Sequence, residues 1–192
     1  MAFELTVIGA SLGGLQALET LLAGLPQAFP LPAVVAQHRH KDSRDLVALL
    51  QRYSLLPVSE VEDKEEIRPG RVYLAPADYH LLIEASHFAL SLEAPVEYAR
   101  PSIDVLFESA AEAYAERVIG VILTGASQDG ARGLAKIKVS GGLTVVQSPA
   151  TAEGQVMPAA AIAATQVDQI LPLSEIALFL TQSVPRGKEY AV

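Results

Sequence analysis

Hydrophobic positions follow two patterns along this chain: short runs rich in β-branched residues, and longer stretches with apolar residues at helical spacing. The short runs predict buried strands, and the longer stretches predict helices that cover them. The expected strands are residues 4–10, 32–37, 57–62, 71–76, 117–124, 143–147 and 168–172. The expected helices are Leu12–Ala23, Ser43–Tyr53, Ser102–Ala115, Asp129–Val139, Met157–Ala164 and Ser174–Thr181, with Ser102 and Ser174 as N-caps.

This alternation of strands and helices predicts a doubly wound α/β fold with a mostly parallel sheet. Residues 80–93 depart from it, because two strand-like segments flank Ala85–His87 and predict an antiparallel hairpin insertion. The 192 residues contain no internal repeat and no low-complexity tract. We therefore expect a single domain over residues 1–192.

Composition excludes several classes of function. The chain has no cysteine, which rules out thiol catalysis, a disulfide framework and cysteine-ligated zinc, and fits a reducing cytoplasm. A net charge of −8 argues against a broad nucleic-acid-binding surface. No apolar run approaches the length of a membrane span, and the N-terminus lacks the basic segment of a signal peptide. We expect a cytoplasmic protein that does not insert into membranes.

The glycine-rich stretch Gly9–Gly14, GASLGG, follows the first expected strand and can be interpreted in several ways. A dinucleotide-binding turn would have glycine where Ser11 stands, and an acidic residue at the end of the second strand, where the chain runs into His38. A P-loop would need a lysine after the glycines, and none follows them here. The same residues match G-x-S-x-G, a strand-to-helix turn that exposes a serine hydroxyl.

Three side chains with complementary chemistry follow expected strands: Ser11, His38 and Asp129. Because catalytic groups gather at the carboxyl ends of strands in a doubly wound sheet, we expect these three to meet. Serine needs a base to become a nucleophile, and the base needs an acid to fix its tautomer. The backbone N–H of Leu12, at a helix N-terminus, would stabilise the oxyanion. The sequence therefore favours a serine nucleophile.

Two alternatives concern the same residues. Asp129 could be only the N-cap of the helix expected to begin there. His38 and His40 have the H-x-H spacing of some metal hydrolases, but a metal site would leave Ser11 and its turn unexplained. We expect no metal and no cofactor.

Several further segments occur in a recognisable order across nearly the whole chain. They are VIGASLGG, AQH at the end of the second strand, PGRVYLAP followed by His80, RPSIDVLFESAA, LTGASQDGARGL, GGLTVVQ and VMPAAAI. Together they resemble the catalytic domain of the CheB-type chemotaxis protein-glutamate methylesterases. The resemblance implies a three-layer α/β/α sandwich that hydrolyses glutamate methyl esters on chemoreceptors, releasing methanol. Some members also deamidate receptor glutamines. The family's catalytic triad falls on Ser11, His38 and Asp129.

The chain departs from the family at several positions near the expected site. Leu12 replaces the usual threonine, Ala126 the usual methionine and Val156 a glycine. The backbone N–H of residue 126 would still serve the oxyanion. A glycine with positive φ could be replaced by valine only at a conformational cost. These changes keep two alternatives open: hydrolysis of another ester or amide, and a non-catalytic partner-binding module.

The resemblance also implies partners and binding residues. The substrate would be the methylated cytoplasmic helices of chemoreceptors, whose carboxylate-rich surface suits the guanidinium of Arg100, with Arg39, Lys41 and Arg44 extending that patch. His80 would lie at the rim of the site, in a structural or substrate-contacting position. No receiver domain fits within the 192 residues, so we expect control by a separate receiver or regulatory protein.

Overall fold

The structure is a computed structural model that describes residues 2–39 and 45–184. Its centre is a seven-stranded sheet with the order β3-β4-β2-β1-β7-β8-β9, in which every neighbouring pair is parallel. The strands are β1 (Leu5–Ala10), β2 (Ala33–Gln37), β3 (Val58–Glu60), β4 (Val72–Leu74), β7 (Val118–Ile122), β8 (Leu143–Gln147) and β9 (Gln169–Leu171). The expected α/β fold with a parallel sheet is confirmed.

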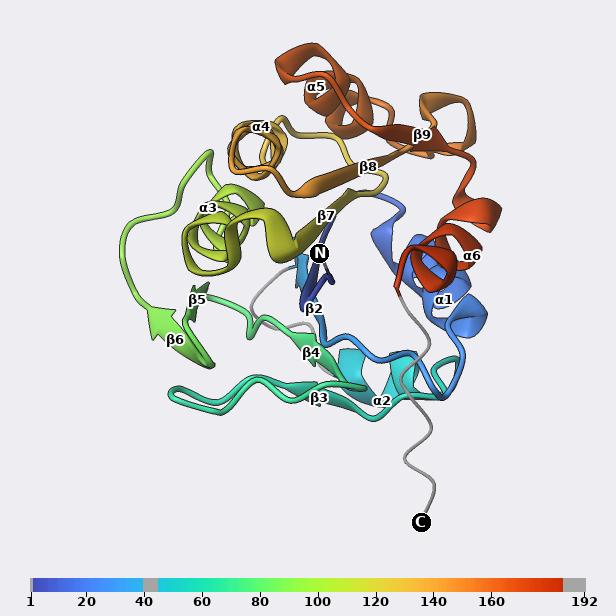
Figure 1. The fold of residues 1–192 in the computed structure, drawn as a ribbon. Coiled ribbons are helices and arrows are strands. Elements are labelled where there is room, and N and C mark those ends of the chain that lie inside the picture. The colour runs from blue at the N-terminus through green and yellow to red at the C-terminus, as the bar shows by residue number, and fades with distance from the viewer. Residues whose placement is uncertain (1, 40–44, 185–192) are drawn as a thin grey trace.

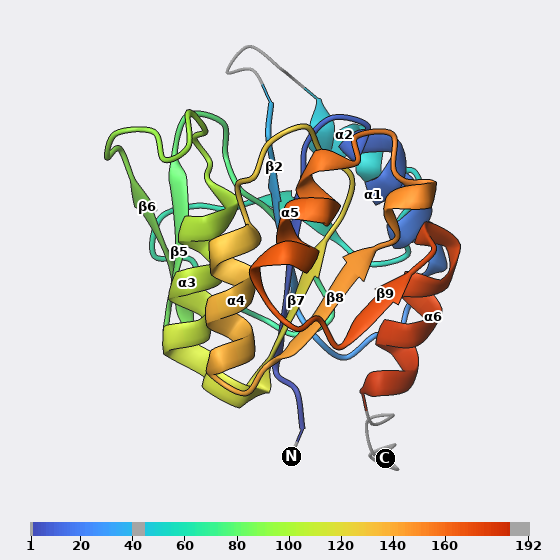
Figure 2. The same ribbon diagram turned by 90° about the horizontal axis from the view of Figure 1, so that it is seen from above.

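Helices cover both faces of the sheet and make it the middle of three layers (Figure 1). On one face lie α1 (Gly14–Gly24), α2 (Leu46–Gln51) and α6 (Leu173–Ser183). On the other lie α3 (Ile103–Tyr114), α4 (Ala131–Val139) and α5 (Val156–Ala164), which stand in front of the sheet in Figure 2. Two short 3-10 turns, Ala115–Arg117 and Pro149–Thr151, complete the helical elements.

Both faces of the sheet are buried, which explains why the strand sequences are continuous apolar runs. In β1 the side chain of Val7 packs in the core under α3, α4 and α5, whereas its neighbour Ile8 packs in the core under α1, α2 and α6. Both are fully buried. A parallel sheet with helices on both faces needs apolar residues at successive positions, not at alternate ones.

The hairpin insertion is also confirmed. Strands β5 (His80–Glu84) and β6 (His87–Ser91) pair antiparallel and form a separate two-stranded sheet. Phe88 of this hairpin meets Tyr73 of β4 edge to face, with ring centroids 4.8 Å apart. The hairpin therefore extends the core on the α3 side of the sheet.

The strand order places Ser11, His38 and Asp129 beyond the carboxyl ends of the central strands. β1 lies between β2 and β7, so the carboxyl ends of these three strands are neighbours. Ser11 directly follows β1, His38 directly follows β2, and Asp129 lies in the loop after β7. Parallel strands bring these three ends to the same edge, where open α/β sheets bind their ligands.

Helix α5 begins at Val156, one residue before the expected Met157, and three further helix starts differ from the structure. Helix α4 begins at Ala131 with Gly130 as its N-cap (φ 98°), so the alternative that Asp129 is only the N-cap of this helix is wrong. Helix α6 begins at Leu173 after Pro172, so Ser174 is not an N-cap. The first helix begins at Gly14 and not at Leu12, because the turn at Gly13 has a left-handed backbone. In each of these three further cases a glycine or proline sets the boundary.

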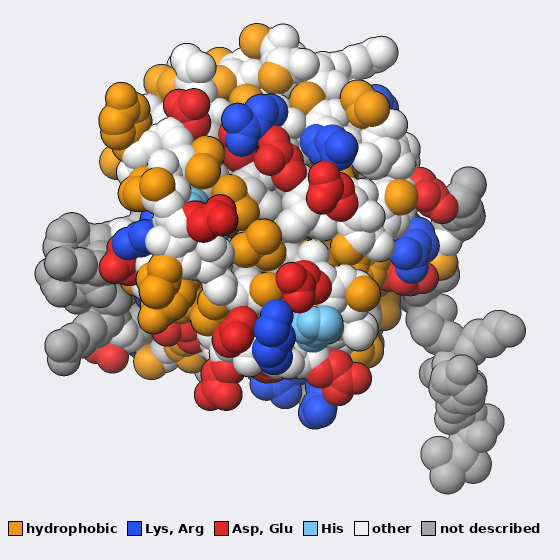
Figure 3. Space-filling model, turned by 90° about the vertical axis from the view of Figure 1, so that its left-hand side faces the viewer, with side chains coloured by type: hydrophobic (Ala, Val, Ile, Leu, Met, Phe, Trp, Pro, Cys, Tyr) orange, Lys and Arg blue, Asp and Glu red, His pale blue; other side chains and the backbone are white. Residues whose placement is uncertain are grey.

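The other cap prediction is confirmed, since Ser102 is the N-cap of α3 and its side chain accepts the N–H of Val105. Ser43, the expected start of α2, lies outside the described residues. Among the helices of the described chain, none has both the length and the apolar character needed to cross a bilayer. On the face shown in Figure 3, basic and acidic side chains are interspersed without a broad basic area.

Candidate active site

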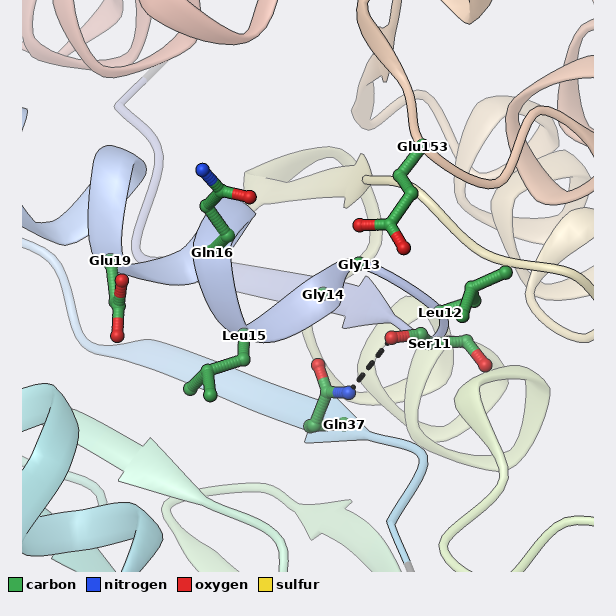
Figure 4. A pocket seen from close by; sticks show the side chains of 9 residues that line it. All are labelled: Ser11, Leu12, Gly13, Gly14, Leu15, Gln16, Glu19, Gln37 and Glu153. Carbon is green, nitrogen blue, oxygen red and sulfur yellow. Dashed lines mark hydrogen bonds between the residues drawn. The ribbon is translucent and has the colours of Figure 1, made fainter.

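The Ser11 turn is held by a hydrogen bond within the turn and by bonds from two neighbouring segments. The Ser11 N–H donates to the carbonyl of Thr124 (2.9 Å), beyond the end of β7. The Ser11 carbonyl accepts from the N–H of Gly14 (2.8 Å) and from Nε2 of Gln37 (3.0 Å) at the end of β2 (Figure 4). With its backbone fixed on both sides, Ser11 presents its hydroxyl beyond the sheet edge.

Gly13 completes this turn, and no other residue fits there without strain. Its φ of +73° lies in the left-handed region. A Cβ built on Gly13 would come within 2.6 Å of the Glu153 carboxylate oxygen Oε2. The glycine therefore serves both the sharp turn and the close approach of the loop that precedes α5.

Thr124 fastens the Ser11 turn to that same loop. Its Oγ1 donates to the carbonyl of Leu12 (2.9 Å) and accepts the N–H of Gly154 (2.7 Å). Next in the chain, a Cβ on Gly125 would lie 2.9 Å from Cβ of Ser11. Thr124 and Gly125 therefore lie directly against the serine turn.

His38 lies between Ser11 and Asp129. Its Nδ1 is 3.2 Å from Oγ of Ser11, and its Nε2 is 2.7 Å from Oδ2 of Asp129. Because an ionised carboxylate only accepts hydrogen bonds, the Nε2 carries the proton, and Nδ1 of the neutral ring faces the serine hydroxyl as an acceptor. The His38 side chain is 15% exposed, which leaves it accessible from the surface.

Asp129 is fully buried, and both oxygens of its carboxylate accept hydrogen bonds. Besides His38, its carboxylate accepts from Oγ of Ser102 (2.9 Å) and from the backbone N–H groups of Ile103 (2.7 Å) and Asp104 (2.9 Å). Burial raises the pKa of this carboxyl, but the bonds from His38 and from the backbone outweigh it, and the pKa lies below its ordinary value. Asp129 is therefore a stable anion that orients the histidine.

The three side chains thus have the geometry of a nucleophile, a base and an orienting acid. The ring nitrogens of His38 are exchanged relative to the serine protease template, with Nδ1 toward the serine. Either imidazole nitrogen can accept a proton while the other donates, so the division of roles is unchanged.

The residues expected to bind the oxyanion lie next to Ser11 in the chain or in the loop after β7. Leu12 is 51% exposed, and among the described residues no backbone carbonyl accepts its N–H. Ala126 is exposed in the loop that packs against Ser11. Val156 is the first residue of α5, so it needs no positive φ and is unstrained in place of glycine.

His80 and Arg100 lie elsewhere. His80 is buried, with Nδ1 accepting the N–H of Ser102 (3.2 Å) and Nε2 donating to the carbonyl of Ala94 (3.1 Å). Arg100 binds Asp78 (2.6 Å) and donates to two backbone carbonyls after the hairpin, those of Leu92 and Glu93. Both side chains hold the segment that leads into α3, and neither offers a free group to a substrate in this arrangement.

The basic patch and the metal alternative involve residues near the loop after β2. Arg39 pairs with Glu60 and also donates to the carbonyl of Ala75. His40, Lys41 and Arg44 lie outside the described residues. Within the part of the chain that the structure describes, no three histidine or carboxylate side chains converge as a metal site.

An open hollow of about 510 Å³ borders the serine (Figure 4). Ser11, Leu12 and Gln37 line its end near the triad, and Glu19 and Glu153 contribute carboxylates. None of its nine lining residues is basic. The hollow is large enough for a side chain that carries an ester or an amide.

The sequence missed the supporting residues of the site. Gln37 and Thr124 fasten the Ser11 turn, and Ser102 donates to Asp129 as well as capping α3. Gln37 is the last residue of β2 and Thr124 lies two residues beyond β7, so both are close to strand ends, the signal that identified His38.

Comparisons with known proteins agree on one family. A family model described as CheB methylesterase matches residues 6–180. A Leptospira interrogans protein named protein-glutamate methylesterase/protein-glutamine glutaminase is 50% identical over 179 residues, covering 92% of this chain and 93% of that protein. A Carboxydothermus hydrogenoformans protein of the same kind is 44% identical over 181 residues, but the chain covers only 53% of its length. The crystal structure of the Thermotoga maritima CheB methylesterase catalytic domain matches with a TM-score of 0.92 at 36% identity, covering 96% of this chain and 100% of that one.

Proposed function

Since this chain belongs to the CheB methylesterase family, we propose that it hydrolyses glutamate methyl esters on chemoreceptors, with Ser11 as the nucleophile. The observation that carries the proposal is the unbroken contact from Ser11 Oγ through the His38 ring to the buried Asp129 carboxylate. A serine in this setting gains a base within reach, and the base gains a fixed tautomer.

In the acylation step, Ser11 Oγ attacks the ester carbonyl while Nδ1 of His38 takes the hydroxyl proton. The imidazolium keeps its Nε2–H bond to Asp129, whose charge stabilises it. We assign the oxyanion to the backbone N–H of Leu12 at the start of α1, with that of Ala126 as a second donor. The C–O bond to the methoxy group then breaks, and methanol leaves with the proton from His38.

Deacylation reverses these roles. His38 takes a proton from a water molecule, the resulting hydroxide attacks the glutamyl ester on Ser11, and the Ser11 oxygen leaves with the proton. The products are a glutamate carboxyl group and the free serine. Every proton moves through His38, so the side chains present suffice for both steps.

Deamidation of receptor glutamines is a second activity that the same steps would support. The Leptospira relative is named as a glutaminase as well as a methylesterase. An amide differs only in its leaving group, which departs as ammonia after protonation by His38. We propose this activity for the same site.

We further propose that the chain works in the cytoplasm on the methylated helices of chemoreceptors. The exposed Leu12 beside the catalytic serine and the open hollow next to it support access by a protein substrate. Arg100 and His80 are left out of the proposed substrate contacts, because their polar atoms bind the chain itself.

The test is methanol release from chemoreceptor membranes that carry a labelled methyl ester. The native chain should release methanol, and Ser11→Ala should lower the rate by about 10⁴-fold or more. Ser140→Ala, at the far end of α4, is the matched control and should keep native activity. Release of methanol by Ser11→Ala at the native rate would contradict the role of Ser11. Turnover of small esters without turnover of receptor would move the proposal to another ester substrate.

A further inference from the structure

Asp104, a buried acid outside the triad, has no part in the chemistry described above. It lies in the first turn of α3 and is 3% exposed. Its Oδ1 accepts two backbone N–H groups from the start of α4, those of Gly130 (2.9 Å) and Gly133 (2.7 Å). Gly130 is the residue directly after Asp129.

The relation between the two acids is reciprocal. Asp129, just before α4, accepts the N–H groups of Ile103 and Asp104 at the start of α3. Asp104, on α3, accepts the N–H groups at the start of α4. Each carboxylate thus satisfies donors that a helix N-terminus leaves without partners inside the helix. The four bonds tie the two helix starts into one closed unit around Asp129.

Close packing makes this unit rigid. A Cβ on Gly133 would lie 2.6 Å from Cβ of Phe107 and 3.1 Å from Cα of Asp104, so the two helices are in backbone contact there. The Asp129 carboxylate has little freedom once the peptide after it is held. A shift of about 1 Å in a catalytic group can lower a rate by about 10²-fold.

Resting on the proposed function, we infer that Asp104 is a positioning residue for the hydrolysis: through Gly130 and Gly133 it fixes the backbone that carries Asp129. The Oδ1 atom of Asp104 acts as an acceptor in this role. The position of that oxygen is what matters, and its negative charge only strengthens the bonds.

The charged groups around Asp104 are consistent with a role that depends on the position of its oxygen and not on its charge. Asp129 faces it from the start of α4, and Arg132 lies 3.7 Å from its other oxygen, Oδ2. Arg132 is itself bound to Glu108 (2.6 Å), and Glu97 lines the same surface hollow as Asp104 and Arg132. Burial, followed by the charge of Asp129, raises the pKa of Asp104 above its ordinary value. An uncharged acceptor of the same shape should therefore be accommodated.

Three substitutions separate acceptor position from charge. Asp104→Asn keeps an oxygen at the same distance from the backbone and removes the charge. Asp104→Glu keeps the charge and displaces the oxygens by one methylene group. Asp104→Ala removes both. Asp168→Ala is the matched control. Asp168 lies just before β9, away from the site, and like Asp104 its carboxylate accepts a backbone N–H, that of Thr144 (3.0 Å).

The experiment measures kcat and KM for methanol release, together with the rate at which a fluorophosphonate labels Ser11. We expect Asp104→Asn to stay within about 5-fold of the native kcat, and Asp104→Ala and Asp104→Glu to lose about 10- to 100-fold. KM should change by less than about 2-fold, since Asp104 does not touch the substrate. Asp168→Ala should keep the native kcat.

Two outcomes would overturn the inference: native kcat in folded Asp104→Ala, or an active Asp104→Glu beside an inactive Asp104→Asn, which would mean that charge matters. If Asp104→Ala does not fold, the Asn and Glu variants decide alone. The labelling rates give the same ranking without the receptor substrate. A native chain that labels at Ser11 but releases no methanol would reject the proposed substrate and leave the test of Asp104 intact.

Discussion

Nε2 of His38 lies 2.7 Å from Oδ2 of Asp129, which joins the end of β2 to the loop after β7 across the intervening strand β1. The same Oδ2 accepts the backbone N–H of Ile103 at 2.7 Å. One buried oxygen therefore orients the proposed base and also accepts a backbone N–H at the N-terminus of α3. Changes at Asp129 are expected to affect catalysis and stability together.

Asp129→Asn should lower kcat by about 10⁴-fold, because an amide has one oxygen where the carboxylate has two and cannot hold the His38 tautomer. Its NH₂ group would also face donors that now have an acceptor, at a cost of about 1–3 kcal/mol in unfolding free energy. Methanol release and denaturant unfolding measure the two effects. Asp168→Asn is the control, and equal losses of activity in both variants would contradict the orienting role.

The dependence of stability on pH should differ between native protein and Asp104→Asn. Burial, and then the charge of Asp129, raises the folded-state pKa of Asp104. A raised carboxyl pKa contributes stability below the unfolded-state pKa, and this contribution is lost as the pH rises through the folded-state value. Asparagine does not titrate, so the variant should gain in stability relative to the native chain between acid and neutral pH. Unfolding free energies over that range measure the difference, and a constant difference would contradict the expectation.

The contribution of Asp129 to stability depends on pH in the opposite direction. Its folded-state pKa is lowered because bonds from His38 and the backbone outweigh the effect of burial. Its contribution to stability is present above the unfolded-state pKa and is lost as the pH falls through the folded-state value. The acid loss of stability in the native chain should therefore be reduced in Asp129→Asn, as denaturant unfolding at acid pH would reveal.

Gly13→Ala should destabilise the protein for two separable reasons. The left-handed backbone at φ +73° costs a non-glycine residue about 1–2 kcal/mol. The new methyl group would also meet the Glu153 side chain at 2.6 Å. Adding Glu153→Ala removes the 2.6 Å contact with the carboxylate oxygen but leaves Cβ of residue 153 at 2.7 Å, as well as the backbone cost, so the double variant should recover only part of the loss. Full recovery in thermal unfolding would show that the turn tolerates alanine.

His80→Leu tests whether His80 supports the scaffold or binds substrate. Leucine fills similar volume but leaves the N–H of the buried Ser102 without its acceptor, at about 1–3 kcal/mol. The carbonyl of Ala94 also loses its donor, but Ala94 is exposed and water can replace it. We expect lower stability and a lower kcat, because Ser102 donates to Asp129, with KM unchanged. A rise in KM at unchanged kcat and stability would instead indicate a substrate contact.

The fold and the three central residues could be predicted because their signals are local. Each strand is a compact apolar run, and Ser11 and His38 stand at the first position after such a run. Parallel connectivity then brings the strand ends together without further information. The hairpin at residues 80–91 was predictable in the same way, from two alternating segments around a short turn.

The cap of α4 could not be predicted, unlike that of α3, because it depends on which helix lies nearby in space. Asp129 precedes α4 in the chain, so sequence spacing indicates a cap for that helix. In the structure its carboxylate closes α3 instead, whose start lies 26 residues earlier at Ile103. Asp104 shows the converse arrangement on α4. Both contacts follow from how closely the two helices pack at Gly133, which no local pattern reports.

The most direct test of the triad is to identify the residue that becomes covalently modified during the reaction. A fluorophosphonate should label the native chain once, and peptide mass spectrometry should place the adduct on Ser11. His38→Ala and Asp129→Asn should slow labelling by several powers of ten while the protein stays folded. An adduct on another residue, or labelling at the native rate without His38, would contradict the assignment of Ser11, His38 and Asp129 as nucleophile, base and orienting acid.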